Sequence, residues 1–408
     1  MGSMASEIGI PEPPAKLDYA DYLIGTVTGL SFAISAVFLG VLPWSGKIAS
    51  GRDFVSYWAT GQQLVHHCNP YDGSAIMRIE QSAGTATSYG VLYMRNPPWA
   101  LPLALPLGYI NISVAAFLWS ALLVGCLFFS IHLLRQMFDS PANYLHWIAA
   151  SFAPALICIL MGQTSLFALL GYVLFLKLNG SRPFLAGASL WLCTLKPHLF
   201  LVFGAVLLVW IVLTKSYRIL AGLATAMAAS CAIVQVIDRT AWTDYMHMMR
   251  TTGIEAERIP CPSVALRILV SPHLFILTWV PVTLATIWAL VYFWHRRSSW
   301  DWMSNGSLLM LVSLVVAPYC WVYDGGLAIP ALLRAAYRTS SRILITILAL
   351  ASLAIDIEIG SGINVPSFFY IWTMPVWLAW YLCATGIKTK TMIEDHADVI
   401  VGDAAIGA

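Results

Sequence analysis

Long apolar runs alternate with short polar turns along nearly the whole chain. A membrane-spanning helix needs about 20 residues, with a range of about 17–25, and several runs are shorter than that. Their number predicts an all-α polytopic membrane protein, a bundle of about twelve transmembrane helices. The runs are Tyr22–Leu42, Ile112–Leu134, Leu145–Met161, Thr164–Leu178, Pro183–Leu195, His198–Thr214, Arg218–Ile237, His273–Trp294, Ser304–Cys320, Leu327–Tyr337, Ile343–Ile359 and Pro366–Ile387.

The basic residues predict the orientation of this bundle. Lys and Arg in short loops mark the cytoplasmic side of a membrane protein. With the N-terminus inside, every inner connection is basic, whereas Lys196 is the one basic residue in the short outer turns. We therefore expect both tails, residues 1–21 and 388–408, in the cytoplasm of a bacterial inner membrane. Residues 22–387 would form a single domain whose active site faces the periplasm or the cell exterior.

The composition restricts the class of protein further. The 408 residues are 59% hydrophobic and 10% charged, against about 25% charged in a soluble domain. No soluble catalytic domain is present, so any chemistry takes place at the membrane. The net charge of +2 argues against a nucleic-acid partner. The eight cysteines form no metal pattern, and we expect no cofactor and no metal. Cys68 and Cys261 fall on the outer face, where they could pair if that face is oxidising, or remain separate thiols.

Two outer connections are long, residues 43–110 and 238–272, and long loops are usually functional. The first contains GRDFVSYWATGQQLVHHCNPYD, Gly51–Asp72, which predicts an amphipathic helix at the membrane interface, ending at Asn69–Asp72. Its polar side carries Asp53, its apolar side faces lipid or the bundle, and Tyr57 lies between the two. The Asp53 carboxylate could act as a general base on a lipid-linked substrate, or could cap the helix by accepting from the Ser56 amide.

The same loop closes with a proline-rich segment. Pro97, Pro98, Pro102 and Pro106 interrupt the stretch that precedes the run at Ile112. Proline ends or kinks a helix, so we expect a re-entrant or interfacial segment here.

Further polar side chains collect on the predicted outer face. Lys196, which departs from the charge rule, could bind a substrate phosphate or reach toward lipid phosphates. Asp324 precedes two glycines and could serve a substrate or cap the following helix. Gln163, in a turn of only a few residues, could serve a substrate or bond between helices. The other candidates for substrate binding are Tyr57, Arg95, Asn96, His198, Arg267 and Tyr323.

Five sequence blocks together resemble glycosyltransferase family 87 of the GT-C superfamily, in particular polyprenol-phosphate-mannose-dependent α-1,2-mannosyltransferases. They are GRDFVSYWATGQQLVHHCNPYD, RNPPWALPLALPL, GQTSLFALLG, LKPHLFLV and APYCWVYDGGLAIPALL, in the family's order. The resemblance implies a GT-C-like bundle. It also implies that Asp53 is the general base, that Lys196 belongs to the Lys-Pro block, and that Tyr323 and Asp324 belong to the late proline-containing block. Asn96 stands where relatives often carry tyrosine.

These features predict a transferase that moves mannose or another glycosyl unit from a polyprenyl phosphate to a hydroxyl of a lipid or glycolipid acceptor, with inversion. Lys196 would stabilise the departing phosphate, with His198 or Arg267. The competing hypothesis is a transporter or flippase of lipid-linked sugars. A transporter would place its ionisable residues near the midplane, whereas here they lie toward one face.

Overall fold

The structure is a computed structural model that describes residues 19–44, 53–84, 90–141, 143–253, 258–361 and 366–386, with side chains described from Asp21 and not for residues 35–44. Apart from Tyr19, Ala20 and Asp21, the two expected tails lie outside these residues. All regular secondary structure in the described part is helical, which confirms the predicted class. Each predicted apolar run coincides with a helix or with consecutive helical segments.

The helical segments that precede the second long loop are α1 (Tyr19–Trp44), α2 (Phe54–Val65), α3 (Gly73–Ser82), η2 (Pro98–Ala100), α4 (Leu101–Ala104), η3 (Leu105–Tyr109), α5 (Ile112–Met137), α6 (His146–Ala150), α7 (Ala153–Met161), α8 (Ser165–Leu178), α9 (Pro183–Ser189), η4 (Leu190–Leu195), η5 (Pro197–Phe200), α10 (Leu201–Thr214) and α11 (Tyr217–Ile237). The remainder are α12 (Ala241–Thr251), α13 (Pro262–Val270), η7 (Phe275–Trp279), α14 (Val280–Arg296), η8 (Arg297–Ser299), the π-helical turn η9 (Trp302–Gly306), α15 (Ser307–Val316), η10 (Val322–Ala328), α16 (Ile329–Arg338), α17 (Arg342–Gly360) and η11 (Ser367–Trp372), which continues as helix to Gly386.

Six helices of the described part are long and apolar enough to cross a membrane, not the twelve expected. They are Ile112–Met137, Pro197–Thr214, Tyr217–Ile237, Phe275–Ser299, Arg342–Gly360 and Ser367–Gly386. The other apolar helices are shorter within the described residues. They are Asp21–Ile34 (the part of α1 whose side chains are described), His146–Met161, Ser165–Leu178, Pro183–Leu195 and Trp302–Val316. The protein is nevertheless a multi-pass membrane protein.

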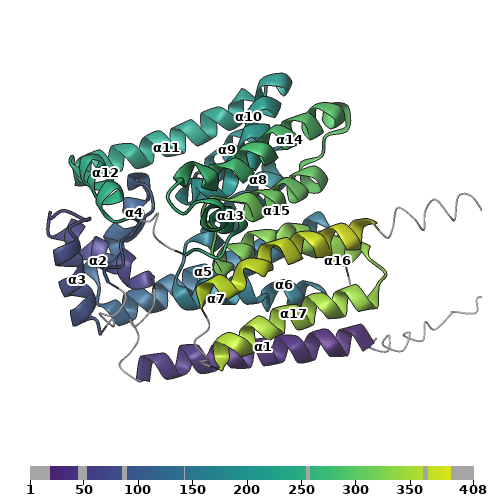
Figure 1. Cartoon of the computed structure of the whole chain (residues 1–408), viewed down its shortest axis with the longest axis horizontal. Helices are drawn as coiled ribbons and strands as arrows, with labels where there is room; N and C mark the ends of the chain where they lie inside the picture. Colours follow the sequence, from purple (N-terminus) through teal and green to yellow (C-terminus); the bar gives the residue numbers. More distant parts are fainter. Residues whose placement is uncertain are drawn as a thin grey trace, which may run out of the picture.

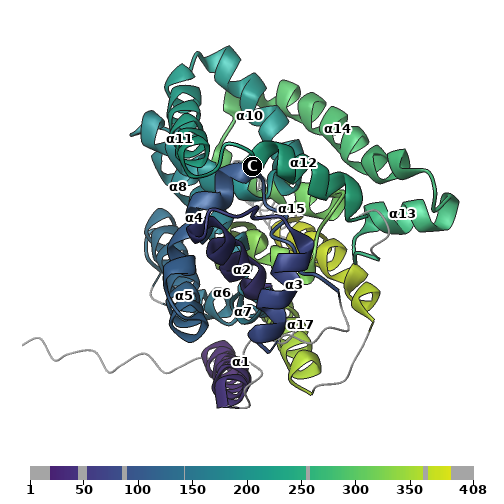
Figure 2. The ribbon, with the colours of Figure 1, turned by 90° about the vertical axis from the view of Figure 1, so that its left-hand side faces the viewer.

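The long helices run roughly side by side, and the long loops gather at one end of the bundle (Figure 1). There α2, α3 and α4 from the first loop lie beside α12 from the second, and the view onto this end shows them together (Figure 2). Helix α1 begins, and the helix ending at Gly386 finishes, at the opposite end (Figure 1). The two described ends of the chain therefore lie on one side of the bundle and the candidate loops on the other.

Helix α2 sits directly on the proline-rich segment. A Cβ at Gly61 would lie 2.3 Å from the Ala104 carbonyl oxygen, and one at Gly108 would lie 2.1 Å from the Gly61 oxygen. Only glycine allows two backbones to approach this closely. Trp58 and Gln62 add hydrogen bonds from their side chains to the carbonyls of Ile110 and Gly108. Residues 98–109 therefore form the surface on which α2 packs.

The packing of α2 shows what surrounds its two sides. Of the two surroundings expected for its apolar side, the bundle is observed, since Phe54 packs against Trp119 of α5. The polar side is covered as well, because Ser56 and Thr60 are buried. The helix also ends at Val65, with His67 in the left-handed region at φ 54°, earlier than the expected stop at Asn69–Asp72. Asp72 instead caps α3 by accepting from the Ser74 and Ala75 amides.

Candidate active site

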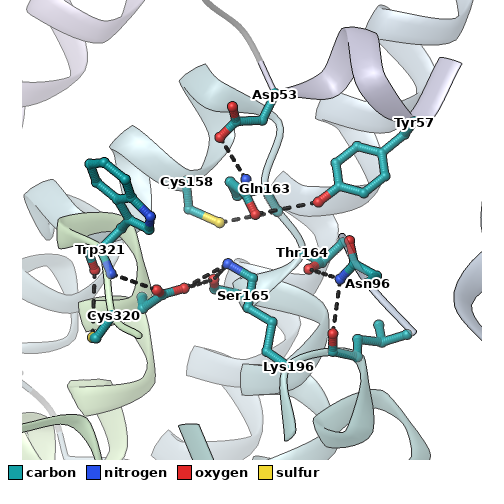
Figure 3. A network of polar contacts seen from close by, with 12 residues as sticks. Asp53, Tyr57, Asn96, Cys158, Gln163, Thr164, Ser165, Lys196, Cys320 and Trp321 are labelled. Carbon is teal, nitrogen blue, oxygen red and sulfur yellow. Dashed lines mark hydrogen bonds and ion pairs between the residues drawn. The ribbon is translucent and has the colours of Figure 1, made fainter. Parts of the chain in front are cut away.

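Asp53 stands immediately before α2, and its carboxylate is held by a side chain from another helix. Oδ2 accepts a hydrogen bond of 2.6 Å from Nε2 of Gln163 (Figure 3). The side chain makes no capping bond to α2, because the Ser56 amide donates to the backbone oxygen of Asp53. The capping alternative is therefore wrong. The carboxylate is positioned by tertiary contact and not by its own helix.

The turn between α7 and α8 determines the position of Gln163. Gly162 ends α7 in the left-handed region at φ 72°, and a Cβ there would lie 2.5 Å from Cβ of Phe54. The Gly162 carbonyl accepts from the Trp119 indole at 2.7 Å, and the Gln163 carbonyl accepts from the Cys158 thiol. These contacts restrict the backbone of Gln163. Its side chain bonds to a residue of another helical segment, as the interhelical alternative predicted.

Tyr57, one turn along α2, completes this half of the site. Its hydroxyl donates to Oε1 of Gln163 at 3.3 Å, so one glutamine joins Tyr57 to Asp53. The ring stacks on Trp119 with centroids 5.3 Å apart. Burial, and after it the nearby Asp53 carboxylate, raises the pKa of Tyr57 well above its usual value. The phenol therefore stays protonated and remains a donor.

The second half of the site is a buried ion pair. Nζ of Lys196, between η4 and η5, lies 2.7 Å from Oδ1 of Asp324 and donates to Oγ of Ser165 at 3.0 Å (Figure 3). Both charged side chains are nearly inaccessible, at 7% and 0% exposure. Ser165 itself donates to the same Asp324 oxygen at 2.6 Å. Lys196 thus turns inward, and the predicted reach toward lipid phosphates is not observed.

Asp324 also fastens the helical turn that carries it. Its second oxygen, Oδ2, accepts from the Trp321 amide at 2.8 Å at the start of η10. The predicted cap is therefore observed in part. Asp324 is the third residue of η10 and binds the amide at its start, but Trp321 holds the capping position. A carboxylate with three donors on two oxygens is held firmly.

Tyr323 lies between the two halves. The Lys196 ammonium stands over its ring, 4.6 Å from the centroid, and the ring stacks on Trp321. Burial, and after it the charge of Asp53, raises the pKa of Tyr323 well above its usual value, which places its phenol within the electrostatic reach of Asp53. Tyr57 and Tyr319 contribute to the same effect. Tyr323 is therefore near both the Lys196 ammonium and the Asp53 carboxylate.

Asn96 and His198 border this arrangement. The Asn96 amide donates to Oγ1 of Thr164 at 3.3 Å and to the Leu195 carbonyl at 2.8 Å, so it ties the turn of Gln163 to that of Lys196. The His198 ring meets Tyr319 edge-on, with centroids 5.3 Å apart. Both predicted residues therefore lie at the site, Asn96 as a brace between its halves.

Arg95 and Arg267 belong to its surroundings by the contacts that the structure describes. The Arg95 carbonyl accepts from the Tyr245 hydroxyl of α12. The Arg267 guanidinium stands over the Phe275 ring at 5.0 Å.

Sequence reasoning missed Ser165, Thr164, Trp321 and Tyr319. Thr164 and Ser165 directly follow Gln163, and Tyr319 and Trp321 lie four and two residues before Tyr323. The only signal available was this adjacency, since hydroxyl and aromatic residues are common near helix ends. Within the described part, no three His, Cys, Asp or Glu side chains group as a metal site.

A family comparison decides the class of protein. The sequence model of glycosyltransferase family 87 matches residues 93–318. The chain belongs to glycosyltransferase family 87. The matched region includes Gln163, Lys196 and the segment up to Pro318, and the base candidate Asp53 lies before it. No curated protein and no solved structure matches the chain. This family 87 protein is therefore a membrane glycosyltransferase, which acts on a sugar donor and an acceptor.

Proposed function

We propose that this family 87 enzyme transfers mannose or another glycosyl unit from a polyprenyl phosphate to a hydroxyl of a lipid or glycolipid acceptor, with Asp53 as general base. The observation that carries the proposal is the contact of 2.6 Å between Gln163 and the Asp53 carboxylate. A carboxylate oriented by another helix, at the end where the loops gather, suits proton transfer better than a helix cap does.

In the proposed reaction, Asp53 takes the proton of the acceptor hydroxyl as its oxygen attacks the anomeric carbon. The bond between that carbon and the phosphate oxygen breaks, and polyprenyl phosphate leaves with the electron pair. A single displacement of this kind inverts the anomeric centre.

Charge at the phosphate would come from Lys196. An ammonium has three N–H donors. Asp324 and Ser165 accept from two of them, and the Tyr323 ring lies 4.6 Å from the nitrogen. A phosphate oxygen would take the third donor in place of the ring, while Asp324 keeps the lysine in position. His198 and Arg267 remain the proposed secondary groups, and Arg95, Asn96 and Tyr323 would border the substrates.

The proposal includes a location. The enzyme would lie in the bacterial cytoplasmic membrane, with the end formed by α2, α3, α4 and α12 on the outer side and both chain ends in the cytoplasm. Support comes from the basic inner turns and from the position of the two described chain ends, opposite the loops (Figure 1). The GT-C-like arrangement is part of the same proposal.

The test uses purified protein in lipid with synthetic short-chain prenyl phosphate sugars. Release of prenyl phosphate is followed with and without a membrane-lipid extract, for wild type and Asp53→Asn. Acceptor-dependent release that the variant loses is the expected result. Donor binding without release, for every donor and acceptor tested, would favour a transporter of lipid-linked sugars, against the family assignment.

A further inference from the structure

Two cysteines from distant parts of the chain lie together beside the candidate site. Cys261 directly precedes α13 in the second long loop, and Cys320 lies in the segment between α15 and η10. Both are free thiols and almost wholly buried, with exposures of 0% and 1%. Cys68, which could pair with Cys261 according to one of the two alternatives, is exposed, and its thiol contacts the His66 carbonyl in its own turn. That pairing is not observed.

Three contacts join the start of α13 to the segment before η10. The Cys261 thiol donates to the Pro318 carbonyl at 3.9 Å, and the Ser263 hydroxyl donates to the Val316 carbonyl at 2.9 Å. The backbone amide of Cys320 also lies near the Cys261 thiol and acts to lower its pKa. The Cys261 thiol therefore lies beside the segment that carries Cys320, two residues after Pro318.

We propose that Cys261 and Cys320 form a disulfide when the protein meets an oxidant of the disulfide class, such as glutathione disulfide or a disulfide oxidoreductase. The thiolate of one cysteine attacks the oxidant's disulfide and displaces one thiol. The second cysteine then attacks the mixed disulfide and displaces the other. Two protein thiols become one disulfide, and the oxidant's disulfide is reduced to two thiols, which carry the two electrons and two protons.

The timing of this reaction follows from burial. The thiolate is the nucleophile, and burial raises the pKa of Cys261 to about 11. In the folded, reduced protein the pair therefore reacts slowly. Oxidation would occur while the second loop is still packing, or when α13 lifts from the segment before η10. The product would fasten α13 to that segment, one residue before Trp321, whose amide holds Asp324.

The experiment maps cysteine linkage directly and does not use sugar transfer as its readout. The full-length protein, purified without reductant, is incubated with glutathione disulfide in mild denaturant and returned to detergent. Free thiols are then alkylated, and non-reduced peptides are identified by mass spectrometry. The expected result is one linked peptide pair containing Cys261 and Cys320, lost on reduction and absent from Cys261→Ser and from Cys320→Ser. A Cys193→Ser control, which removes another buried thiol, should retain the link.

A second measurement, of the unfolding temperature, tests the proposal in the wild type even if one of the serine variants folds poorly. Dithiothreitol should lower the unfolding temperature of the oxidised wild type by several degrees, because a cross-link restricts the unfolded chain. It should leave Cys320→Ser unchanged. Separate alkylation of both thiols in the oxidised wild type, or a link from Cys261 to Cys68, would overturn the proposal.

Discussion

Nε2 of Gln163 donates to Oδ2 of Asp53 at 2.6 Å, although the two residues belong to different helical segments of the bundle. The same glutamine accepts from Tyr57 through Oε1. Because Gln163 donates to Asp53 through Nε2 and accepts from Tyr57 through Oε1, the two bonds set the orientation of its amide. This arrangement leads to the first two predictions.

Asp53→Asn should lower the transfer rate by about 100-fold or more, the range expected for loss of a general base. The amide keeps the size of the side chain but cannot accept the proton. Prenyl phosphate release from a synthetic donor measures the effect. Asp72→Asn is the matched control, because Asp72 caps α3 and asparagine is an equally good cap. Equal loss in both variants would contradict a catalytic role for Asp53.

Gln163→Glu should move the acidic limb of the pH–rate profile to higher pH. A second carboxylate beside Asp53 disfavours its ionised form and so raises the pKa of Asp53 relative to wild type. Gln163→Leu should move that limb in the same direction, because it removes a hydrogen bond that favours the ionised carboxylate. Profiles of kcat/KM against pH measure both shifts. An acidic limb that stays in place in both variants would show that Asp53 is not the group that titrates in it.

Lys196→Met should destabilise the protein by about 3–5 kcal/mol, the cost of leaving a buried charge without its partner. Here the remaining charge is the Asp324 carboxylate, which is fully buried. The double variant Lys196→Met/Asp324→Leu should recover much of the loss. Thermal unfolding in detergent measures both, with exposed Arg218→Met as control. A double variant less stable than Lys196→Met would show that the pair is not coupled.

Gly61→Ala should destabilise the protein by at least about 1–3 kcal/mol, the usual cost of overpacking. The new Cβ would lie 2.3 Å from the Ala104 oxygen, a backbone atom that cannot rotate away. Gly125→Ala is the control, because a Cβ there meets nothing within 4 Å. Similar unfolding temperatures for the two variants would show that α2 separates readily from residues 98–109.

Glu80 should make stability depend on pH. Burial raises its pKa from 4.5 to about 7, and its carboxylate accepts from the Leu92 amide. Because the folded pKa lies above the unfolded one, the contribution of Glu80 is fully present below about pH 4.5 and is lost as the pH rises through about 7. Glu80→Gln does not titrate, so its unfolding temperature relative to wild type should be higher at pH 8 than at pH 5. A constant difference would contradict the shift.

The helical class and the helix positions were predictable because apolar runs specify buried or lipid-facing helices locally. The number of spans was not. The run from Pro183 to Leu195 has the composition of a span, but the helix that it forms is too short to cross a membrane. Hydropathy does not determine the length of the helix that a run forms.

The site was predictable as a set of residues and not as a set of contacts. Asp53, Gln163 and Lys196 stood out because polar groups are rare beside apolar runs. Their partners depend on tertiary geometry: the left-handed Gly162 directs Gln163, and the η10 turn brings Asp324 to Lys196. Cys261 illustrates the same limit, since loop position indicated Cys68 and the fold places Cys320 beside it.

The glycine contact between α2 and η3 also determines how the enzyme can move. Two segments joined backbone to backbone at Gly61 and Gly108 cannot slide past each other, so they travel as one rigid body. Any approach of Asp53 toward an acceptor must carry residues 98–109 with it. Paired labels on α2 and η3 would then keep a constant separation during turnover.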